Sequence, residues 1–246
     1  MNEIDTAPGE GKGLLNFTLG CFFAGWTSVL CIWLYAYSIR QGGVPCWDEF
    51  ERCAWASHIW YDIRHLDFFH FWKHSNVQVV WPPLHSWMTG ALFALFDPSL
   101  AAGRLLSLAA FWGSGVLIWL WFARRSTPAS WLSGAVAWGL YTTCPIAIQQ
   151  AVGIMSEGVG LFLTLLILAL LPDKDGEPSS RWTWTGWLLG FFFLYKYNYA
   201  FLTYTGLFVA RYFQAGASLR GMLNKNNLRL FGLPVLLMLL WFIPNA

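Results

Sequence analysis

The sequence predicts an all-helical, polytopic membrane protein with about seven transmembrane helices, each built on about 20 mainly apolar residues. Of its 246 residues, 57% are hydrophobic and only 11% are charged, whereas soluble domains are about half apolar and a quarter charged. The chain holds 17 tryptophans, a residue that favours the boundary between lipid headgroups and hydrocarbon. Long apolar runs also recur along the chain, separated by turns rich in glycine, proline and charge.

The N-terminal region predicts a cytoplasmic tail followed by a retained membrane span. Residues 1–13 are polar and mixed in charge, and the apolar run 14–38 is long enough to cross about 30 Å of hydrocarbon. A cleavable signal peptide would need a basic start, a short apolar run and a small-residue cleavage site. We therefore predict that residues 14–38 form the first transmembrane helix.

Residues 39–99 predict an external loop with interfacial helices. Within it, apolar positions recur at helical intervals: Cys46, Phe50, Cys53, Ala54, Trp60 and Tyr61. The opposite face carries Asp48, Glu51, Arg52, His58, Asp62 and His65, which predicts an amphipathic helix over 46–65 lying on the membrane surface. The later apolar run 83–96 has about 14 residues rising about 1.5 Å each, which is too short to cross a bilayer. We predict an interfacial or re-entrant helix there.

The remainder of the chain, residues 100–246, predicts about six further transmembrane helices. The apolar runs are 100–122, 129–147, 155–171, 183–197, 199–213 and 228–244. If the run 83–96 stays on the surface, the basic residues between these runs all fall on the cytoplasmic side, as the positive-inside rule requires. These are Arg124, Arg125, Lys174, Arg181, Arg211, Arg220, Lys225 and Arg229. The predicted N-terminus is therefore cytoplasmic and the predicted C-terminus external.

The acidic pair Asp48-Glu49 stands just beyond the outer end of the first span, in the first turn of the predicted interfacial helix. Acidic residues stabilise helix N-termini, so helix stabilisation is one interpretation of the pair. The other is catalytic, because a carboxylate at the membrane surface can remove a proton from an acceptor hydroxyl. Two adjacent acids also suit a divalent metal, so the role of the pair stays open at this point.

Several short segments occur in a characteristic order. After Asp48-Glu49 come Trp81-Pro82-Pro83-Leu84, a short apolar helix ending in Phe96-Asp97-Pro98, Gly103-Arg104-Leu105-Leu106-Ser107, Met155-Ser156-Glu157-Gly158 and Leu194-Tyr195-Lys196-Tyr197-Asn198. This order resembles the membrane glycosyltransferases of the GT-C fold. It is most similar to the polyprenyl-phosphate-sugar-dependent branch, which includes protein O-mannosyltransferases and the aminoarabinose transferases that modify lipid A. The resemblance covers most of the chain.

The resemblance implies a GT-C-like core that moves a sugar from a polyprenyl phosphate to a hydroxyl of a protein, lipid or glycan acceptor, with inversion. It implies that Asp48 is the catalytic base and Glu49 an adjacent orienting or metal-facing acid. Arg104, Glu157 and Lys196 are implied to bind substrate or phosphate, since positive charge stabilises a leaving phosphate. No cofactor is certain, and the requirement for a divalent metal stays open, because two adjacent acids suit either metal binding or acid–base chemistry. The implied location is a bacterial plasma membrane, with the site on the external, periplasmic face.

Some features depart from the family pattern and keep alternatives open. Many members have a Tyr soon after Asp-Glu and a Lys before the proline pair, where this chain has Arg52-Cys53 and Trp81. The family also usually has more spans and often a C-terminal soluble domain. A non-catalytic or truncated GT-C-like protein is therefore the main alternative. A transporter component is less favoured, because we find neither intramembrane acids nor paired repeats.

The charged residues, cysteines and histidines of the chain bear on other partners and sites. The formal charge of +2 and the scattered basic residues exclude a nucleic-acid footprint. Cys46 and Cys53 share a loop and could form a disulfide in an oxidising compartment. His70 and His74 stand four residues apart and so share one helical face, with His58, His65 and His85 in the neighbourhood. Such ligands suit zinc, although no ordered ligand motif accompanies them.

Overall fold

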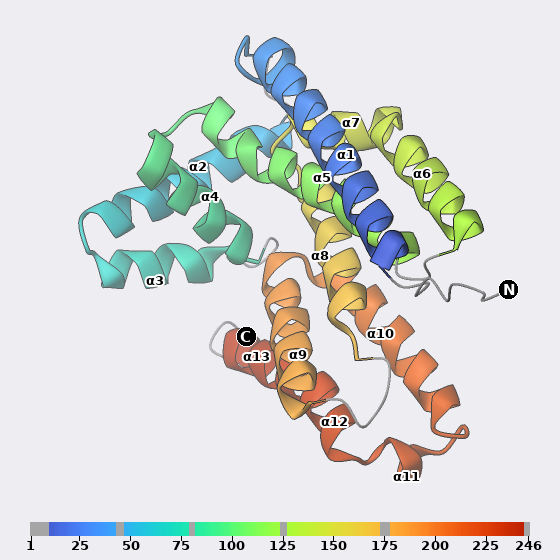
Figure 1. Cartoon of the computed structure of the whole chain (residues 1–246). Coiled ribbons are helices and arrows are strands. Elements are labelled where there is room, and N and C mark those ends of the chain that lie inside the picture. The colour runs from blue at the N-terminus through green and yellow to red at the C-terminus, as the bar shows by residue number, and fades with distance from the viewer. Residues whose placement is uncertain (1–9, 43–46, 79–81, 124–126, 173–177, 244–246) are drawn as a thin grey trace, which may run out of the picture.

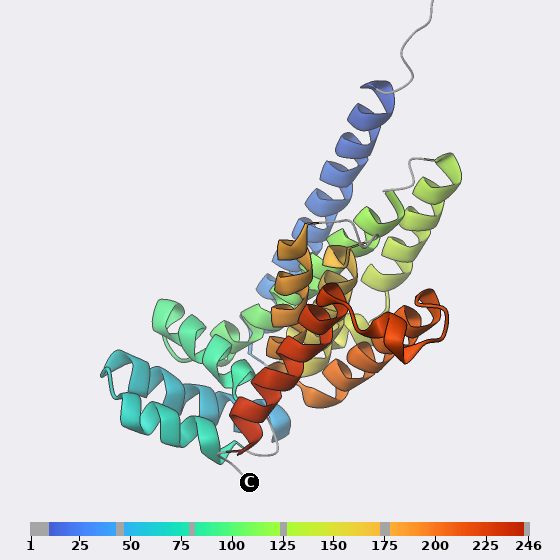
Figure 2. The same ribbon diagram turned by 90° about the horizontal axis from the view of Figure 1, so that it is seen from below.

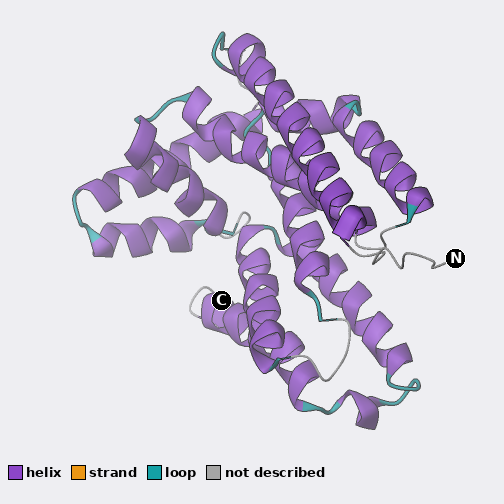
Figure 3. Cartoon of the chain, viewed as in Figure 1, coloured by secondary structure: helices purple, strands orange, loops and turns teal. Residues whose placement is uncertain are grey.

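The computed structural model describes residues 10–42, 47–78, 82–123, 127–172 and 178–243, and every regular element within these ranges is a helix (Figure 3). The all-helical prediction is confirmed for this part of the chain. The first half contains α1 (Glu10–Leu34), the π-helical turn η1 (Tyr35–Ile39), α2 (Trp47–Arg64), α3 (Phe68–Val77), α4 (Leu84–Phe96), α5 (Leu100–Ala123), α6 (Pro128–Thr142) and α7 (Pro145–Val152). The second half contains α8 (Ser156–Leu170), α9 (Ser179–Tyr195), α10 (Tyr197–Gln214), α11 (Leu219–Met222), α12 (Lys225–Asn227), η2 (Leu228–Gly232) and α13 (Leu233–Phe242).

Helix α5 lies at the centre of the molecule and packs against α1, α4, α6, α7 and α8 (Figure 1). Helices α2, α3 and α4 form a separate layer that projects to one side of α5 (Figures 1 and 2). Helices α8, α9, α10 and α13 form a second bundle, which α8 connects to α5. The beginnings of α2, α5 and α8 and the end of α9 therefore converge in the middle of the chain's fold.

Two helical stretches, Phe17–Ile39 and Leu100–Phe122, are long and apolar enough to cross a membrane, each with 23 residues. A third crossing is available if α7 and α8 count as one broken span, since they meet at a bend of 109°. The predicted run 129–147 is divided between two helices. Helix α6 ends at Thr142, and α7 begins at Pro145, because a proline cannot continue the helix that precedes it. Helix α8 has 15 residues, or about 22 Å, short of a bilayer core.

The boundary of the N-terminal tail needs a correction. Residues 10–13, assigned to the cytoplasmic tail, belong to the first turn of α1, and the apolar stretch that could cross a membrane begins at Phe17. Helical geometry extends past the apolar run because a helix needs no apolar side chains to continue its backbone hydrogen bonds. The apolar helical stretch Phe17–Ile39 otherwise overlaps the predicted span 14–38.

A helix is present where one was predicted over 46–65, namely α2, but its faces are not those we assigned. Phe50 and Tyr61 are exposed, whereas Glu49, Arg52 and Asp62 are buried with Ala56 and Ile59. This buried face packs against α4, where a Cβ on Gly90 would lie 2.9 Å from Cγ2 of Ile59. The polar residues turn inward because other helices supply their partners, and the aromatic ones face outward, where lipid can cover them.

The predicted short helix is confirmed as α4, which has 13 residues and packs on α2, α5 and α9. It ends because Asp97 adopts a left-handed φ of 61° and Pro98 follows, so the chain turns sharply into α5. The 13 residues of α4 correspond to about 20 Å, which is shorter than a hydrocarbon core of about 30 Å.

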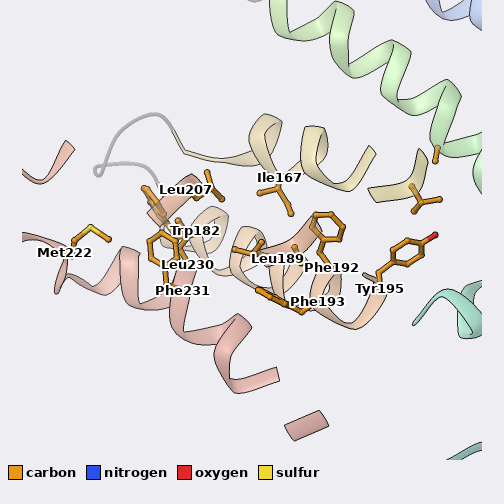
Figure 4. Close-up of a cluster of buried hydrophobic side chains, with 13 residues drawn as sticks. Ile167, Trp182, Leu189, Phe192, Phe193, Tyr195, Leu207, Met222, Leu230 and Phe231 are labelled. Atoms are coloured by element: carbon orange, nitrogen blue, oxygen red, sulfur yellow. The ribbon is translucent and has the colours of Figure 1, made fainter. Parts of the chain in front are cut away.

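A hydrophobic cluster of buried residues centres on α9 and includes side chains of α8, α10 and η2 (Figure 4). Trp182, Leu189, Phe192 and Phe193 of α9 are buried there together with Leu230 and Phe231 of η2. Gly186 and Gly190 form a Gly-x-x-x-Gly pair that lets the two backbones approach closely. A Cβ on Gly186 would lie 2.2 Å from the carbonyl oxygen of Arg229, and one on Gly190 would lie 2.5 Å from Cδ1 of Leu237.

We predict that Gly186→Ala lowers the free energy of unfolding by about 1–3 kcal/mol, because the added methyl group must push backbone away. Gly206→Ala on α10 is the matched control, since nothing lies within 4 Å of its Cβ position. Thermal unfolding of both variants in detergent measures the difference. Equal melting temperatures would contradict the close contact of α9 with η2.

Candidate functional site

A buried ion pair joins the start of α2 to the start of α5. Arg104 donates from Nε to Oε1 of Glu49 and from Nη2 to Oε2, both at 3.1 Å. The two side chains are each only 5% exposed. Bidentate guanidinium–carboxylate geometry is strong and directional, so the pair fixes α2 against α5. Two residues selected from the sequence, 55 positions apart, are thus in direct contact.

The same carboxylate also supports the bend between α7 and α8. The backbone amide of Ile154 donates to Oε1 of Glu49 at 2.7 Å. One residue later, the Met155 amide donates to Oγ of Ser107 at 3.3 Å, and that hydroxyl donates to the Met155 carbonyl at 3.2 Å. Backbone groups at a helix break have no intrahelical partner, so side chains of α2 and α5 satisfy them here.

A second ion pair stands directly after this bend. Lys196, between α9 and α10, donates through Nζ to Oε1 of Glu157 and, at 2.6 Å, to Oγ of Ser156. The Lys196 side chain is 6% exposed and that of Glu157 is 34% exposed, so the acid faces an opening while the ammonium lies beneath it. Lys196 Nζ also lies 5.3 Å from the centre of the Tyr199 ring, within the range of a cation–π interaction.

Both ion pairs flank one short segment of the chain, residues 153–157. Glu49 contacts its beginning through Ile154, and Lys196 contacts its end through Ser156 and Glu157. The structure thus brings Glu49, Arg104, Glu157 and Lys196 to one junction of α2, α5, α8 and α9. It does so as separate pairs rather than as one set of converging side chains.

Asp48 differs from its neighbour in environment. It is half-buried in the first turn of α2, and among the residues that the structure describes none forms a hydrogen bond or ion pair with its carboxylate. Glu49, one residue later, is buried and engaged with Arg104. The acidic pair read from the sequence is therefore divided between a structural carboxylate and an accessible one.

Three further buried residues lie at this junction, to which sequence reasoning gave no catalytic or binding role: Arg52, His85 and Tyr195. The His85 and Tyr195 rings are 5.5 Å apart, and Arg52 lies within electrostatic range of both and of Glu157. Burial, helped by the positive charges of Arg52 and Lys196, lowers the pKa of His85 to about 3, so its imidazole is neutral at pH 7. Its Nδ1 has no hydrogen-bond partner among the described residues.

Local signals for these residues were present in the sequence. Arg52 follows Asp48 by four positions and Glu49 by three, which places it on the same side of a helix. His85 directly follows the proline segment, and Tyr195 directly precedes Lys196. We had assigned Arg52 to the solvent side of α2, and that assignment is wrong because its side chain is only 7% exposed.

A cavity of about 390 Å³ adjoins the second ion pair. Its wall is mainly apolar and includes Phe111, Ala147 and Leu161, with Glu157, Gln150 and Tyr199 as polar members. Oε1 of Gln150 and Oε2 of Glu157 are buried without a hydrogen-bond partner among the described residues. A few oriented polar groups in an apolar hollow are typical of small-molecule sites.

The histidines of α2 and α3 are engaged with aspartates. His70 Nδ1 lies 2.7 Å from Asp67, and His74 Nδ1 lies 2.7 Å from the buried Asp62. Hydrogen bonds from His70, first from its amide and then from its ring, hold the pKa of Asp67 below its usual range. Within the described ranges no group of three or more metal-ligating side chains occurs. The zinc hypothesis at His70 and His74 therefore has no third ligand in that part of the chain.

The disulfide hypothesis concerns Cys46 and Cys53. Cys53 is a free thiol, and burial raises its pKa to about 11, so it stays protonated at neutral pH. Cys46 and Trp81, together with Arg124 and Arg125, lie outside the described residues.

Comparison of the chain with family models, with curated proteins and with solved structures gave no significant match.

We predict that Glu49→Gln lowers the free energy of unfolding by about 3–5 kcal/mol, because it leaves the buried Arg104 charge without its counter-ion. The neighbouring Asp48→Asn change should alter stability by less than about 0.5 kcal/mol, because it breaks no described contact. Thermal unfolding in the same detergent compares the two carboxylate-to-amide changes. Similar losses for both would contradict the different roles of the two acids.

Proposed function

We propose that this chain is a membrane glycosyltransferase that moves a sugar from a polyprenyl phosphate to a hydroxyl-bearing acceptor at the external face of a bacterial plasma membrane. The proposed arrangement is GT-C-like, with about seven crossings and a cytoplasmic N-terminus. The observation that carries the proposal is the junction itself. Glu49, Arg104, Glu157 and Lys196, which resemble family positions far apart in the sequence, meet around residues 153–157.

Asp48 is the base in this proposal. Its carboxylate removes the proton from the acceptor hydroxyl while that oxygen attacks the anomeric carbon of the donor sugar. The bond between the anomeric carbon and the phosphate oxygen breaks, and the lipid phosphate leaves with the bonding electrons. Attack from the face opposite the leaving group inverts the anomeric centre. The lack of described partners for Asp48 supports this role, since a base must be reachable.

Lys196 and Arg52 are the cations that stabilise the leaving phosphate in this proposal. Both are buried, where an opposite charge is stabilised more than it is in water. The family's Lys before the proline pair is replaced here by Trp81, and Arg52, one helical turn after Asp48, supplies positive charge from α2 instead. Glu157, which contacts Lys196 and borders the cavity, orients the ammonium group.

Glu49 and Arg104 act as positioning residues in this proposal. The Arg104 guanidinium and the Glu49 carboxylate are paired with each other and are buried, so neither is available to a metal or a phosphate. Their function is to hold the first turn of α2, and with it Asp48, against the bend that carries Glu157. This assignment replaces the direct substrate contact that the resemblance implied for Arg104 and the metal-facing role implied for Glu49.

A non-catalytic role is the second candidate, and the closure of both ion pairs within the chain favours it. Buried pairs of this kind also occur as purely structural links between helices. The two candidates differ in one respect that an assay detects. A transferase depends on Asp48, which makes no described contact, whereas a structural protein does not.

We predict that Asp48→Asn lowers sugar transfer by at least about 100-fold, the range usual for loss of a general base, without loss of folded protein. Membranes containing the full chain are supplied with a panel of radiolabelled polyprenyl-phosphate sugars, and label in acceptor material is counted. Asp97→Asn, at an exposed acid after α4, is the matched control and should keep full activity. Equal transfer by Asp48→Asn and the unchanged chain would remove Asp48 from the mechanism.

A further inference from the structure

The segment between α10 and α13 carries large aliphatic side chains on its outside. This C-terminal elbow, residues 215–232, contains α11, α12 and η2. Leu219, Leu223 and Leu228 are 65%, 83% and 70% exposed. Aliphatic side chains gathered in this way on a short surface segment mark a contact with lipid or with another molecule.

A groove runs between the elbow and α10, with a volume of about 610 Å³. Phe208, Met222 and Phe231 contribute apolar walls, and the exposed leucines of the elbow line its sides. Polar groups occur at Asn224, Lys225 and Asn227. A hollow of this size and polarity suits a hydrocarbon chain that ends in a polar group.

The elbow has a defined shape, because Arg211 at the end of α10 holds it from inside. Arg211 Nε donates to Oδ1 of Asn227 at 3.1 Å, and Nδ2 of Asn227 donates to the Met222 carbonyl at 3.2 Å. The guanidinium also lies 4.9 Å from the centre of the Trp182 ring. This basic residue is therefore structural, and the groove is a formed feature rather than a loose loop.

The remaining basic residues of the elbow point to an anionic occupant. Arg220 and Lys225 are exposed and Arg229 is half-buried. Residues 178–246 contain no Asp or Glu, so the elbow has no carboxylate within its own part of the sequence. The nearest acids in the sequence, Asp173, Asp175 and Glu177, precede α9. Among the residues that the structure describes, none forms an ion pair with Arg220, Lys225 or Arg229, so the elbow combines an apolar groove with positive charge.

The position of the elbow suits a membrane surface. Helix α10 begins beside Lys196 and ends at Gln214, and its 18 residues correspond to about 27 Å. The elbow therefore lies at the opposite end of α10 from the candidate site. If that site is external, the elbow meets the cytoplasmic leaflet, whose anionic lipids attract basic segments.

We propose that the C-terminal elbow binds an anionic phospholipid, with one acyl chain in the groove and the phosphate at Arg220 and Lys225. The inference uses the proposed membrane orientation but does not depend on sugar transfer. A zwitterionic lipid offers the same chain without net negative charge, so selectivity between the two reports on the basic residues. The groove supplies affinity for the chain and the basic residues supply selectivity for the headgroup.

The test is lipid binding by the purified full chain in detergent, measured by native mass spectrometry. Phosphatidylglycerol and phosphatidylcholine with identical acyl chains are compared. We expect phosphatidylglycerol to bind at least about tenfold more tightly, since each nearby basic residue contributes about a fivefold factor. The double change Arg220→Gln/Lys225→Gln should abolish most of this preference and leave phosphatidylcholine binding unchanged.

A matched control separates the site from total charge. Arg64→Gln/Lys73→Gln removes the same charge from exposed residues of α2 and α3, and it should keep the preference. Equal binding of the two lipids, or equal loss in both double variants, would overturn the proposal. Glycerophosphoglycerol tests the groove, because it carries the headgroup without acyl chains. Competition by it at the same concentration as the intact lipid would also overturn the proposal.

Discussion

The buried contact of Glu49 with Arg104 and the Ile154 amide is the constraint on which the rest of the structure depends. A carboxylate is costly to bury, and here its oxygens are satisfied by a bidentate guanidinium and a backbone donor. The same contact fixes α2 against α5 and holds the break between α7 and α8. It thereby sets where Ser156 and Glu157 meet Lys196. The second ion pair has a fixed position because the first one exists.

The sequence predicts the helical class, the bounds of α2 and α4, and residue types that meet at one junction. It does not predict how those residues pair. Consecutive helical residues are rotated by about 100°, so Asp48 and Glu49 look equivalent in the sequence but occupy different environments. The number of membrane-spanning helices also does not follow from the apolar runs. An apolar run reports composition, whereas the length of a helix is limited by the residues that break it. Pro145, the bend after Val152 and the extended Lys196 shorten the helices.

The missed residues have a common physical origin. Arg52, His85 and Tyr195 come from α2, α4 and α9, and only the packing of these helices brings them together. The exchange of faces on α2 has a related cause. In water, apolar residues indicate the buried side of a helix, but lipid can cover aromatic residues such as Phe50 and Tyr61. Charged residues then face the interior, where neighbouring helices supply their hydrogen-bond and ion-pair partners.

The Glu49 contact also has a consequence for the order in which the protein is made. Helix α2 leaves the ribosome well before Arg104, and the bend at Ile154 follows later still. Until both have been synthesised, the Glu49 carboxylate has no partner and favours water over the interior. Helix α2 therefore gains its buried contact only after Arg104 and the bend at Ile154 have both been synthesised. The N-terminal half of the chain thus completes its fold only after residues beyond its own midpoint, as far as the bend at Ile154, have been translated.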